Sequence, residues 1–297
     1  MRLSSINFKK LITFICYIVL LCLSGQSIAM TIKVMGAQAE EDTSHQYFID
    51  LLQLAAQKVE DELGKVNIEV IPRGDLSHAS LIRLLNLGEI DVFWAGTNTE
   101  RENTLLPIRI PLMRGLLGYR VSIIHKDNVE KFSKPAFDIQ QAKACQLTHW
   151  PDFKILQDNG FLVIGVEEFS RIFQLTHKKR CDYFPRAIYE GYSELAQAQR
   201  KYPELTMYEQ ALLYYPFPMY YFTNQSNLGK ARWIELALKK MIDDGSFEQL
   251  MQNHPLTGHL FPLAKWADKP VIHLENKQLP PQTPLDDKSL WLQIGKK

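Results

Sequence analysis

The sequence predicts an α/β fold made of two lobes, each a mostly parallel sheet flanked by helices. The first observation is an alternation of strand and helix patterns over residues 31–94. The second is a restart of that alternation after residue 117, and the third is an aromatic segment at 212–222 that leads to a long amphipathic helix. Strands that alternate with helices imply right-handed crossovers and parallel pairing, so each alternating half predicts one lobe.

The first lobe is expected from three short apolar runs separated by two helical patterns. Apolar residues recur at helical spacing through Tyr47–Leu63, and they recur again on one face of Ser77–Leu87. The unbroken apolar run at Asp91–Trp94 is typical of a strand covered on both faces. The expected strands are Thr31–Met35, Val66–Ile71 and Ile90–Trp94.

The second lobe repeats this scheme. Pro151 stands at the first position of a helical pattern, and Asn159-Gly160 directly follows it, so one helix is expected at Pro151–Asp158. The other expected elements are the strands Tyr119–Ile124, Ala144–Leu147, Phe161–Ile164 and Cys181–Phe184 and the helices Glu167–His177 and Arg186–Arg200.

The chain then returns to the first lobe. Residues 212–222 predict an extended connection because Pro216 and Pro218 interrupt the aromatic run. The helix Asn227–Asp243 follows, then another helix after the turn at Gly245, and from Pro255 a proline-rich segment that wraps the first lobe. Lobe one is therefore expected at 31–116 and 219–297 and lobe two at 117–218, with two hinge crossings and a ligand cleft between the lobes.

The first 29 residues predict a secretory signal peptide. A basic start precedes the apolar run Leu11–Leu23, and Ser27-Ile28-Ala29 is a small-x-small cleavage pattern. A retained membrane anchor is the alternative, and the apolar run is short for that role. Lipoprotein processing at Cys22 is disfavoured because Leu21 precedes it. The protein is expected in the periplasm, with the leader cleaved near Ala29.

Charge and cysteine content narrow the function classes. Loss of the leader leaves 31 Lys and Arg against 33 Asp and Glu, a formal charge near −2, which argues against a nucleic-acid partner. Two cysteines remain, Cys145 and Cys181. In an exported protein they form one disulfide or stay as two buried thiols, and the sequence leaves both alternatives open.

Several segments resemble one known family. "TNTERENTLLPIRIPL" (Thr97–Leu112) resembles the signature loop of periplasmic solute-binding proteins of the amino-acid type (family 3-like), the extracellular receptors of ABC importers. "MIDDGSFEQLMQNH" (Met241–His254) resembles their C-terminal helix pair. His149–Phe161, Arg180–Glu194 and Val271–Leu285 resemble a further branch of the same superfamily. The resemblance covers nearly the whole mature chain and implies the type II periplasmic-binding-protein fold.

The resemblance implies a ligand role for the loop that follows the strand Ile90–Trp94. In the relatives, the loop arginine clamps the α-carboxylate of the ligand, and that role falls on Arg101; a guanidinium offers a planar fork that matches a carboxylate. The alternative is that Arg101 binds its own loop carbonyls or Glu102. The preceding residues are expected to offer backbone groups and an aromatic face to the ligand: Trp94, Gly96, Thr97 and Asn98.

The second lobe departs from the relatives. They place an acidic residue after the last strand of this lobe, whereas the matching position here is closest to Arg186. This difference puts a simple amino acid in doubt as the ligand. If Arg101 and Arg186 face each other across a cleft, they would favour an anionic ligand. The alternative is that Arg186 pairs with Glu190 one helical turn later.

Three further residues are candidates for ligand contact. Glu40, beside Asp42, and Tyr47 follow the first strand, where the alternative is a solvated acidic turn. Trp150 precedes a helix whose free N–H groups could meet an anion, and the alternative is that Trp150 packs on its lobe.

These features predict an exported, monomeric solute-binding protein without cofactor or metal. It would capture a small anionic or zwitterionic, amino-acid-like solute and deliver it to an ABC permease. A receptor that reports to a membrane sensor protein is the second hypothesis, and a periplasmic enzyme on the same fold is the third. The sequence contains no Gly-x-Ser-x-Gly, phosphate-binding glycine loop or His-Glu-x-x-His motif, so no catalytic residue is nominated.

Overall fold

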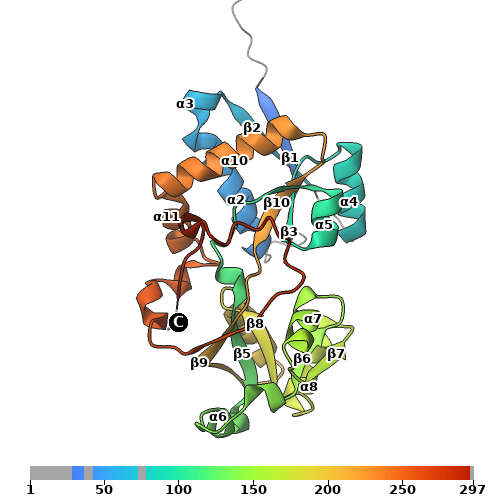
Figure 1. The fold of residues 1–297 in the computed structure, drawn as a ribbon, viewed down its shortest axis with the longest axis vertical. Helices are drawn as coiled ribbons and strands as arrows, with labels where there is room; N and C mark the ends of the chain where they lie inside the picture. Colours follow the sequence, from blue (N-terminus) through green and yellow to red (C-terminus); the bar gives the residue numbers. More distant parts are fainter. Residues whose placement is uncertain (1–28, 37–42, 73–77, 295–297) are drawn as a thin grey trace, which may run out of the picture.

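Two lobes lie one above the other along the long axis of the molecule (Figure 1). The computed structural model describes residues 29–36, 43–72 and 78–294. Residues 1–28 of the predicted leader (1–29) and Glu40 lie outside these residues. Within the described part of the chain, no helix is both long and apolar enough to cross a membrane.

The upper lobe is built on strands from distant parts of the chain. Strand β1 (Met30–Met35) pairs in parallel with β2 (Val66–Ile71). Strand β10 (Met219–Thr223) lies between β3 (Phe93–Gly96) and β4 (Leu106–Ile108) and is antiparallel to both. A parallel bridge between Val34 and Val92 connects β1 to the chain just before β3. The return of the chain at β10 therefore completes this lobe.

Amphipathic helices cover the upper sheet. Helix α2 (Thr43–Lys58) buries the apolar residues predicted for it, including Phe48, Leu51 and Ala55, and packs against α10 (Leu228–Asp243). The other helices of this lobe are α3 (Glu60–Leu63), α4 (His78–Leu87), α5 (Thr99–Thr104) and α11 (Ser246–Asn253).

The lower lobe holds a six-stranded sheet in the order β11-β9-β5-β8-β6-β7. Its strands β8, β6 and β7 are parallel to one another, whereas β5 is antiparallel to both of its neighbours, β8 and β9. The bounds of the strands are β5 Tyr119–His125, β6 Ala144–Leu147, β7 Val163–Val166, β8 Tyr183–Ala187, β9 Leu205–Tyr214 and β11 Val271–His273. The helices are α6 Val129–Phe132, α7 Pro151–Asp158, α8 Phe169–His177 and α9 Gly191–Gln199.

In the described part of the chain, six short 3₁₀ helices lie in the connections. They are η1 Leu116–Gly118, η2 Lys126–Asn128, η3 Ile139–Gln141, η4 Gly258–Leu260, η5 Leu263–Trp266 and η6 Lys288–Leu290.

The two cysteines of the lower lobe form a disulfide. Cys145 on β6 and Cys181 just before β8 are both fully buried, with their Cα atoms 5.7 Å apart. This distance is normal for a disulfide. The sequence left open whether these cysteines form a disulfide or remain two buried thiols, and the structure shows the disulfide.

The predicted two-lobe α/β architecture is confirmed, and several element boundaries differ, of which two bear on the site. The helix expected from Arg186 begins only at Gly191, because Tyr183–Ala187 form strand β8, in which every residue is buried. Strand β3 covers Phe93–Gly96 and not Ile90–Trp94. The apolar content of the sequence shows where such a short strand lies, but hydrogen bonding to the neighbouring strands decides where it begins and ends.

The chain after Pro255 contributes to both lobes. Strand β11 pairs in parallel with β9 in the lower sheet, although the sequence assigned this segment to lobe one. Strand β9 offers an unpaired edge, and any short extended segment can fill it without a periodic signal of its own. The red segment in Figure 1 crosses the waist of the molecule to reach the lower lobe and then crosses it again.

Candidate functional site

Trp94 lies on β3 in a cluster of aromatic rings. Its ring centroid is 4.4 Å from that of His45, 5.3 Å from that of Phe48 and 6.2 Å from that of Tyr221. The indole is half-buried. Trp94 thus combines packing within the upper lobe with an exposed part beside the predicted ligand loop.

The loop after Trp94 is shaped by close contacts. A Cβ atom at Gly96 would lie 2.5 Å from the ring of Phe217, so only glycine fits there. The buried Thr97 donates its hydroxyl to Oε1 of Glu102 at 2.6 Å, and the side chain of Asn98 accepts the backbone N–H of Arg101 at 2.8 Å. Asn98 is therefore the N-cap of α5, and asparagine is a favoured residue at this position. The helix α5 was not predicted from the sequence.

Arg101 turns toward its own loop. Its guanidinium donates to the carbonyl oxygen of Gly96 and lies over the ring of Phe222, with Cζ 5.9 Å from the centroid. Burial lowers the pKa of Arg101 from its usual value. Glu102 pairs with Arg109 at 2.6 Å. The loop-carbonyl contact named as the alternative is thus present, and contact with a ligand stays a prediction.

Arg186 lies in a cage of carboxylates and aromatic rings on the lower lobe. Its guanidinium contacts Glu190 at 2.8 Å, and its Nε donates to Glu194 at 2.6 Å. Cζ lies 4.6 Å from the ring centroid of Trp150, and the rings of Phe184 and Phe169 are 5.5 and 5.8 Å away. The predicted alternative, pairing with Glu190, is therefore present, although Arg186 is on a strand and Glu190 precedes a helix.

A second buried ion pair lies beside this cage. Nη2 of Arg120 is 2.7 Å from Oδ1 of Asp152, and both side chains are less than a tenth exposed. Tyr215 donates its hydroxyl to the same carboxylate oxygen, and its ring centroid lies 5.0 Å from Cζ of Arg120. The sequence analysis did not assign this pair, because no local spacing links two residues on different elements.

The two pairs form one charged cluster at the helix starts of the lower lobe. Three carboxylates, of Asp152, Glu190 and Glu194, face two guanidiniums, of Arg120 and Arg186. Burial raises the pKa of Glu190, an effect that the guanidinium of Arg186 opposes. Arg186 is held by internal partners, so it does not face the upper lobe as a free cation.

The remaining candidates are placed as follows. Tyr47 is fully buried in the core of the upper lobe, where its hydroxyl donates to the carbonyl of Leu112 at 3.0 Å and burial raises its pKa. Trp150 is the residue before α7 and packs on Arg186 and on Phe169. Glu40 lies outside the described residues. The structure therefore groups Trp94, Gly96, Thr97, Asn98 and Arg101 on the upper lobe and Trp150 and Arg186 on the lower one.

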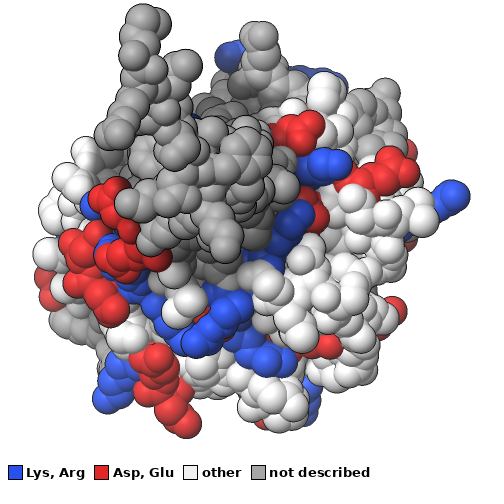
Figure 2. Space-filling view, turned by 90° about the horizontal axis from the view of Figure 1, so that it is seen from above, with Lys and Arg blue, Asp and Glu red and all other residues white. Residues whose placement is uncertain are grey.

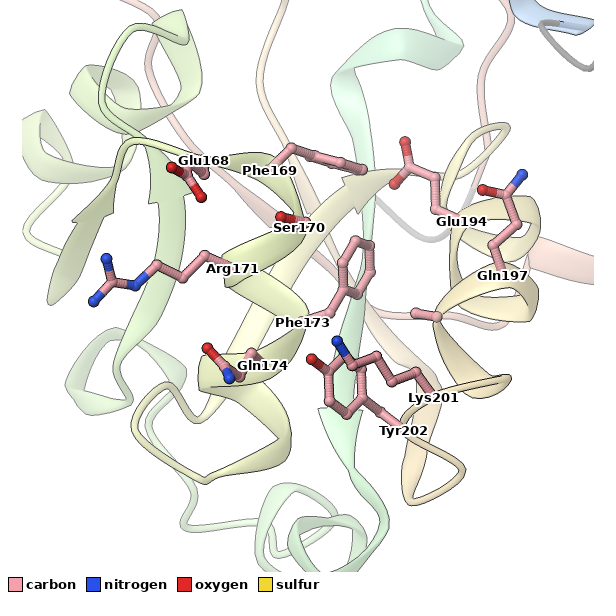
Figure 3. Close-up of a pocket in the computed structure, with 11 residues that line it drawn as sticks. Glu168, Phe169, Ser170, Arg171, Phe173, Gln174, Glu194, Gln197, Lys201 and Tyr202 are labelled. Carbon is pink, nitrogen blue, oxygen red and sulfur yellow. The ribbon is translucent and has the colours of Figure 1, made fainter.

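The lower lobe also has a groove on its surface. A groove of about 590 Å³ runs between α8 and α9, with the rings of Phe169, Phe173 and Tyr202 along it (Figure 3). Glu194 and Lys201 line it from the side of α9. Among the residues that the structure describes, no group of three or more His, Cys, Asp or Glu side chains is placed to hold a metal ion. Acidic and basic side chains both appear on the face of the molecule seen in Figure 2.

His254 gives the fold a dependence on pH. Its Nδ1 accepts the N–H of Leu256 at 3.1 Å, its ring packs on Tyr47, and burial lowers its pKa below the ordinary 6.5. The unfolded chain therefore takes up the proton first, so the free energy of unfolding should decrease as the pH falls through about 6.5 toward the lower folded pKa. Urea unfolding at a series of pH values measures this slope.

The matched variant is His254→Asn. The side-chain oxygen of asparagine can accept the N–H of Leu256, as His254 does, and asparagine does not titrate. Its slope between pH 7 and 5 should be smaller than that of the wild type. An equal slope would assign the effect to other histidines, such as His125 and His259, whose pKa values burial also lowers.

The two α/β lobes and the two crossings between them have the architecture expected for the type II periplasmic-binding-protein fold. No protein-family model and no curated protein matches the chain. Solved structures do. An ancestral arginine-binding protein bound to arginine superposes with a TM-score of 0.52 at 20% identity, covering 76% of this chain and 98% of its own.

Two other neighbours have the same fold. The probable amino-acid ABC transporter extracellular-binding protein from Bacillus subtilis matches with a TM-score of 0.54 at 14% identity, over 77% of this chain and 99% of its own. A histidine kinase sensor domain with similarity to periplasmic binding proteins matches with a TM-score of 0.50 at 14% identity, over 76% and 96%. At these identities the likeness establishes the fold.

Proposed function

We propose that this protein is an exported solute-binding protein of the periplasm, which captures a small solute between its lobes and delivers it to an ABC permease. The observation that carries the proposal is the pair of lobes, with the loop Trp94–Arg101 at the carboxyl end of β3, where open α/β sheets bind ligands. Neighbours named as amino-acid-binding and arginine-binding proteins share this fold. Residues 1–29 would serve as the signal peptide that brings the chain to the periplasm.

The solute is proposed to be anionic or zwitterionic, with its carboxylate at Arg101. Arg101 is half-buried and already donates to Gly96, so one edge of its guanidinium is oriented by the loop before any ligand arrives. A guanidinium whose position the loop already fixes loses little conformational freedom when it binds a carboxylate. The half-buried ring of Trp94 would cover an apolar part of the solute.

Residues 30–297 should first be screened by thermal shift against amino acids, dicarboxylates, short peptides and polyamines. A ligand that binds only the folded protein stabilises it by RT ln(1 + [L]/Kd), about 2.7 kcal/mol at a hundredfold excess over Kd. A shift confined to carboxylate-bearing solutes is expected.

Replacing Arg101 with alanine should weaken binding of that solute at least about tenfold, or about 1.4 kcal/mol, because a charge-assisted contact is lost. Isothermal titration measures the dissociation constant, and urea unfolding verifies that the variant remains folded. The matched control is Arg232→Ala on α10, an exposed arginine that pairs with Glu235 away from the loop. Equal affinities of both variants and the wild type would rule out Arg101 as the carboxylate contact.

A receptor for a membrane sensor is the second candidate, favoured by the fold match to a histidine kinase sensor domain. Transport and signalling differ in which membrane protein the solute-bound form activates. Stimulation of ATP hydrolysis by a reconstituted permease supports transport, whereas solute-dependent binding to the periplasmic part of a sensor, without such stimulation, supports signalling.

A further inference from the structure

The C-terminal segment, residues 271–294, is tied to both lobes, and we call it the strap. On the lower lobe, β11 extends the sheet at the edge of β9, and the N–H of Leu274 donates to the carbonyl of Tyr214 at 2.7 Å. The side-chain amide of Asn159, at the end of α7, donates to the carbonyl of Glu275 at 2.7 Å and accepts its N–H at 2.9 Å. The start of the strap is therefore fixed to the lower lobe at two elements.

The strap then passes along the second hinge crossing to the upper lobe. The side-chain amide of Asn276, itself nearly buried, donates to the carbonyl of Pro216 at 2.9 Å, within the crossing between β9 and β10. The hydroxyl of Thr99, at the start of α5, donates to the carbonyl of Gln278 at 3.4 Å. The strap thus spans from the lower sheet to the loop region of the upper lobe (Figure 1).

The end of the strap covers the first hinge crossing. Gly115 has a φ of +87°, and a Cβ atom there would lie 2.7 Å from the ring of Trp291. The neighbouring Arg114 also has a positive φ, of 47°, and its carbonyl accepts the N–H of Leu292 at 2.7 Å, while its Nε donates to the carbonyl of Leu290 at 3.1 Å. A positive φ is sparsely populated at a residue other than glycine, so the conformation of Arg114 needs support from its surroundings, and here the strap supplies it.

The strap also reaches the first strand of the lower lobe from this position. The N–H of Ile294 donates to the hydroxyl of Tyr119 at 3.3 Å, and Tyr119 opens β5 directly after the crossing. The side chains of Leu290, Trp291 and Ile294 are all buried. One segment therefore contacts both sides of the first crossing as well as the second crossing.

We propose that the strap limits the angle between the lobes, so that wide opening of the cleft requires Trp291 to leave Gly115. Hinge motion needs φ and ψ changes at a few residues, and Arg114 and Gly115 are such residues. While Trp291 covers Gly115 and Leu292 holds the carbonyl of Arg114, those torsions cannot change freely. The proposal concerns the range of lobe motion and does not depend on which solute binds.

The test measures the distance between spin labels on the two lobes. Labels at Arg83→Cys on α4 and Lys178→Cys after α8 occupy exposed positions, and the native cysteines are bonded to each other. The full mature chain should give a narrow distance distribution. Trp291→Ala should broaden it and add a population at another distance, whereas the control Leu285→Ala, at an exposed strap residue, should leave it unchanged. A folded Trp291→Ala protein with the same distribution as Leu285→Ala overturns the proposal.

Hydrogen exchange of the unaltered protein tests the same point if Trp291→Ala does not fold. The N–H groups of Leu116 and Gly118 are bonded within the first crossing, to Met113 and Gly115, and the N–H of Leu292 is bonded to Arg114. If the strap holds the crossing, the amides of Leu116 and Gly118 should exchange no faster than that of Leu292. Exchange of those two amides at least about tenfold faster than Leu292 would show that the crossing opens beneath an intact strap and would refute the proposal.

Discussion

Replacing Arg186 with alanine is expected to lower the free energy of unfolding by about 3–5 kcal/mol. The side chain is buried among Glu190, Glu194 and three aromatic rings, so its removal leaves two carboxylates near each other without the cation that compensates them. It also removes the group that packs on Trp150. Urea unfolding followed by circular dichroism measures the loss.

The control variant is Arg171→Ala on α8, an exposed arginine of the same lobe that should change stability by no more than about 0.5 kcal/mol. The triple variant Arg186→Met, Glu190→Gln, Glu194→Gln should recover much of the loss, since breaking a buried ion pair is more harmful than replacing the whole set with neutral residues. If Arg186→Ala were as stable as Arg171→Ala, the cage would contribute nothing to the folded state.

Removal of the disulfide should have an effect of similar size. The bridge joins Cys145 and Cys181 across 36 residues, and closure of a loop of that length in the unfolded chain corresponds to about 3–4 kcal/mol. The double variant Cys145→Ala, Cys181→Ala should lose this amount in urea unfolding without reductant. The bridge is fully buried, so reduction of the folded wild type should be slow.

Added reductant separates the bridge from other effects of the substitutions. The wild type should lose stability after unfolding and refolding in dithiothreitol, whereas the double variant should be unaffected by the reagent. A double variant as stable as the oxidised wild type would contradict the expected contribution of the bridge.

Much of the fold follows from periodicity in the sequence. The helices α7 and α10 were predicted close to their observed limits, because long apolar faces and terminal Pro and Asn-Gly signals are local. The helix predicted at Tyr47–Leu63 exists, but it begins at Thr43 and is divided into α2 and α3. Strand β8 was predicted to end too early, and β11 was not predicted at all. Both depend on partner strands that lie far away in sequence, and no local pattern contains that information.

The candidate site was predictable only in part. The position of Arg101 shortly after β3 followed from the sequence, which left open whether its guanidinium contacts a ligand or the loop carbonyls. The structure shows the contact with the carbonyl of Gly96 and places Arg101 in α5. The pair Arg120–Asp152 links β5 to α7, and neither residue stands in a motif. Side-chain partners of this kind are set by the packing of elements, which a single sequence does not show.

The order of the strands in the upper lobe sets the order in which the two lobes can fold as the chain is made. Strand β10 lies between β3 and β4, so these two strands have no common partner until residue 223 has been synthesised. By then the strands β5 to β9 have already emerged, and they form most of the lower sheet without help from the rest of the chain. The lower lobe can thus form first, while β3 and β4 expose unpaired edges that invite aggregation. Folding of the upper lobe is therefore the step at which a chaperone would matter most.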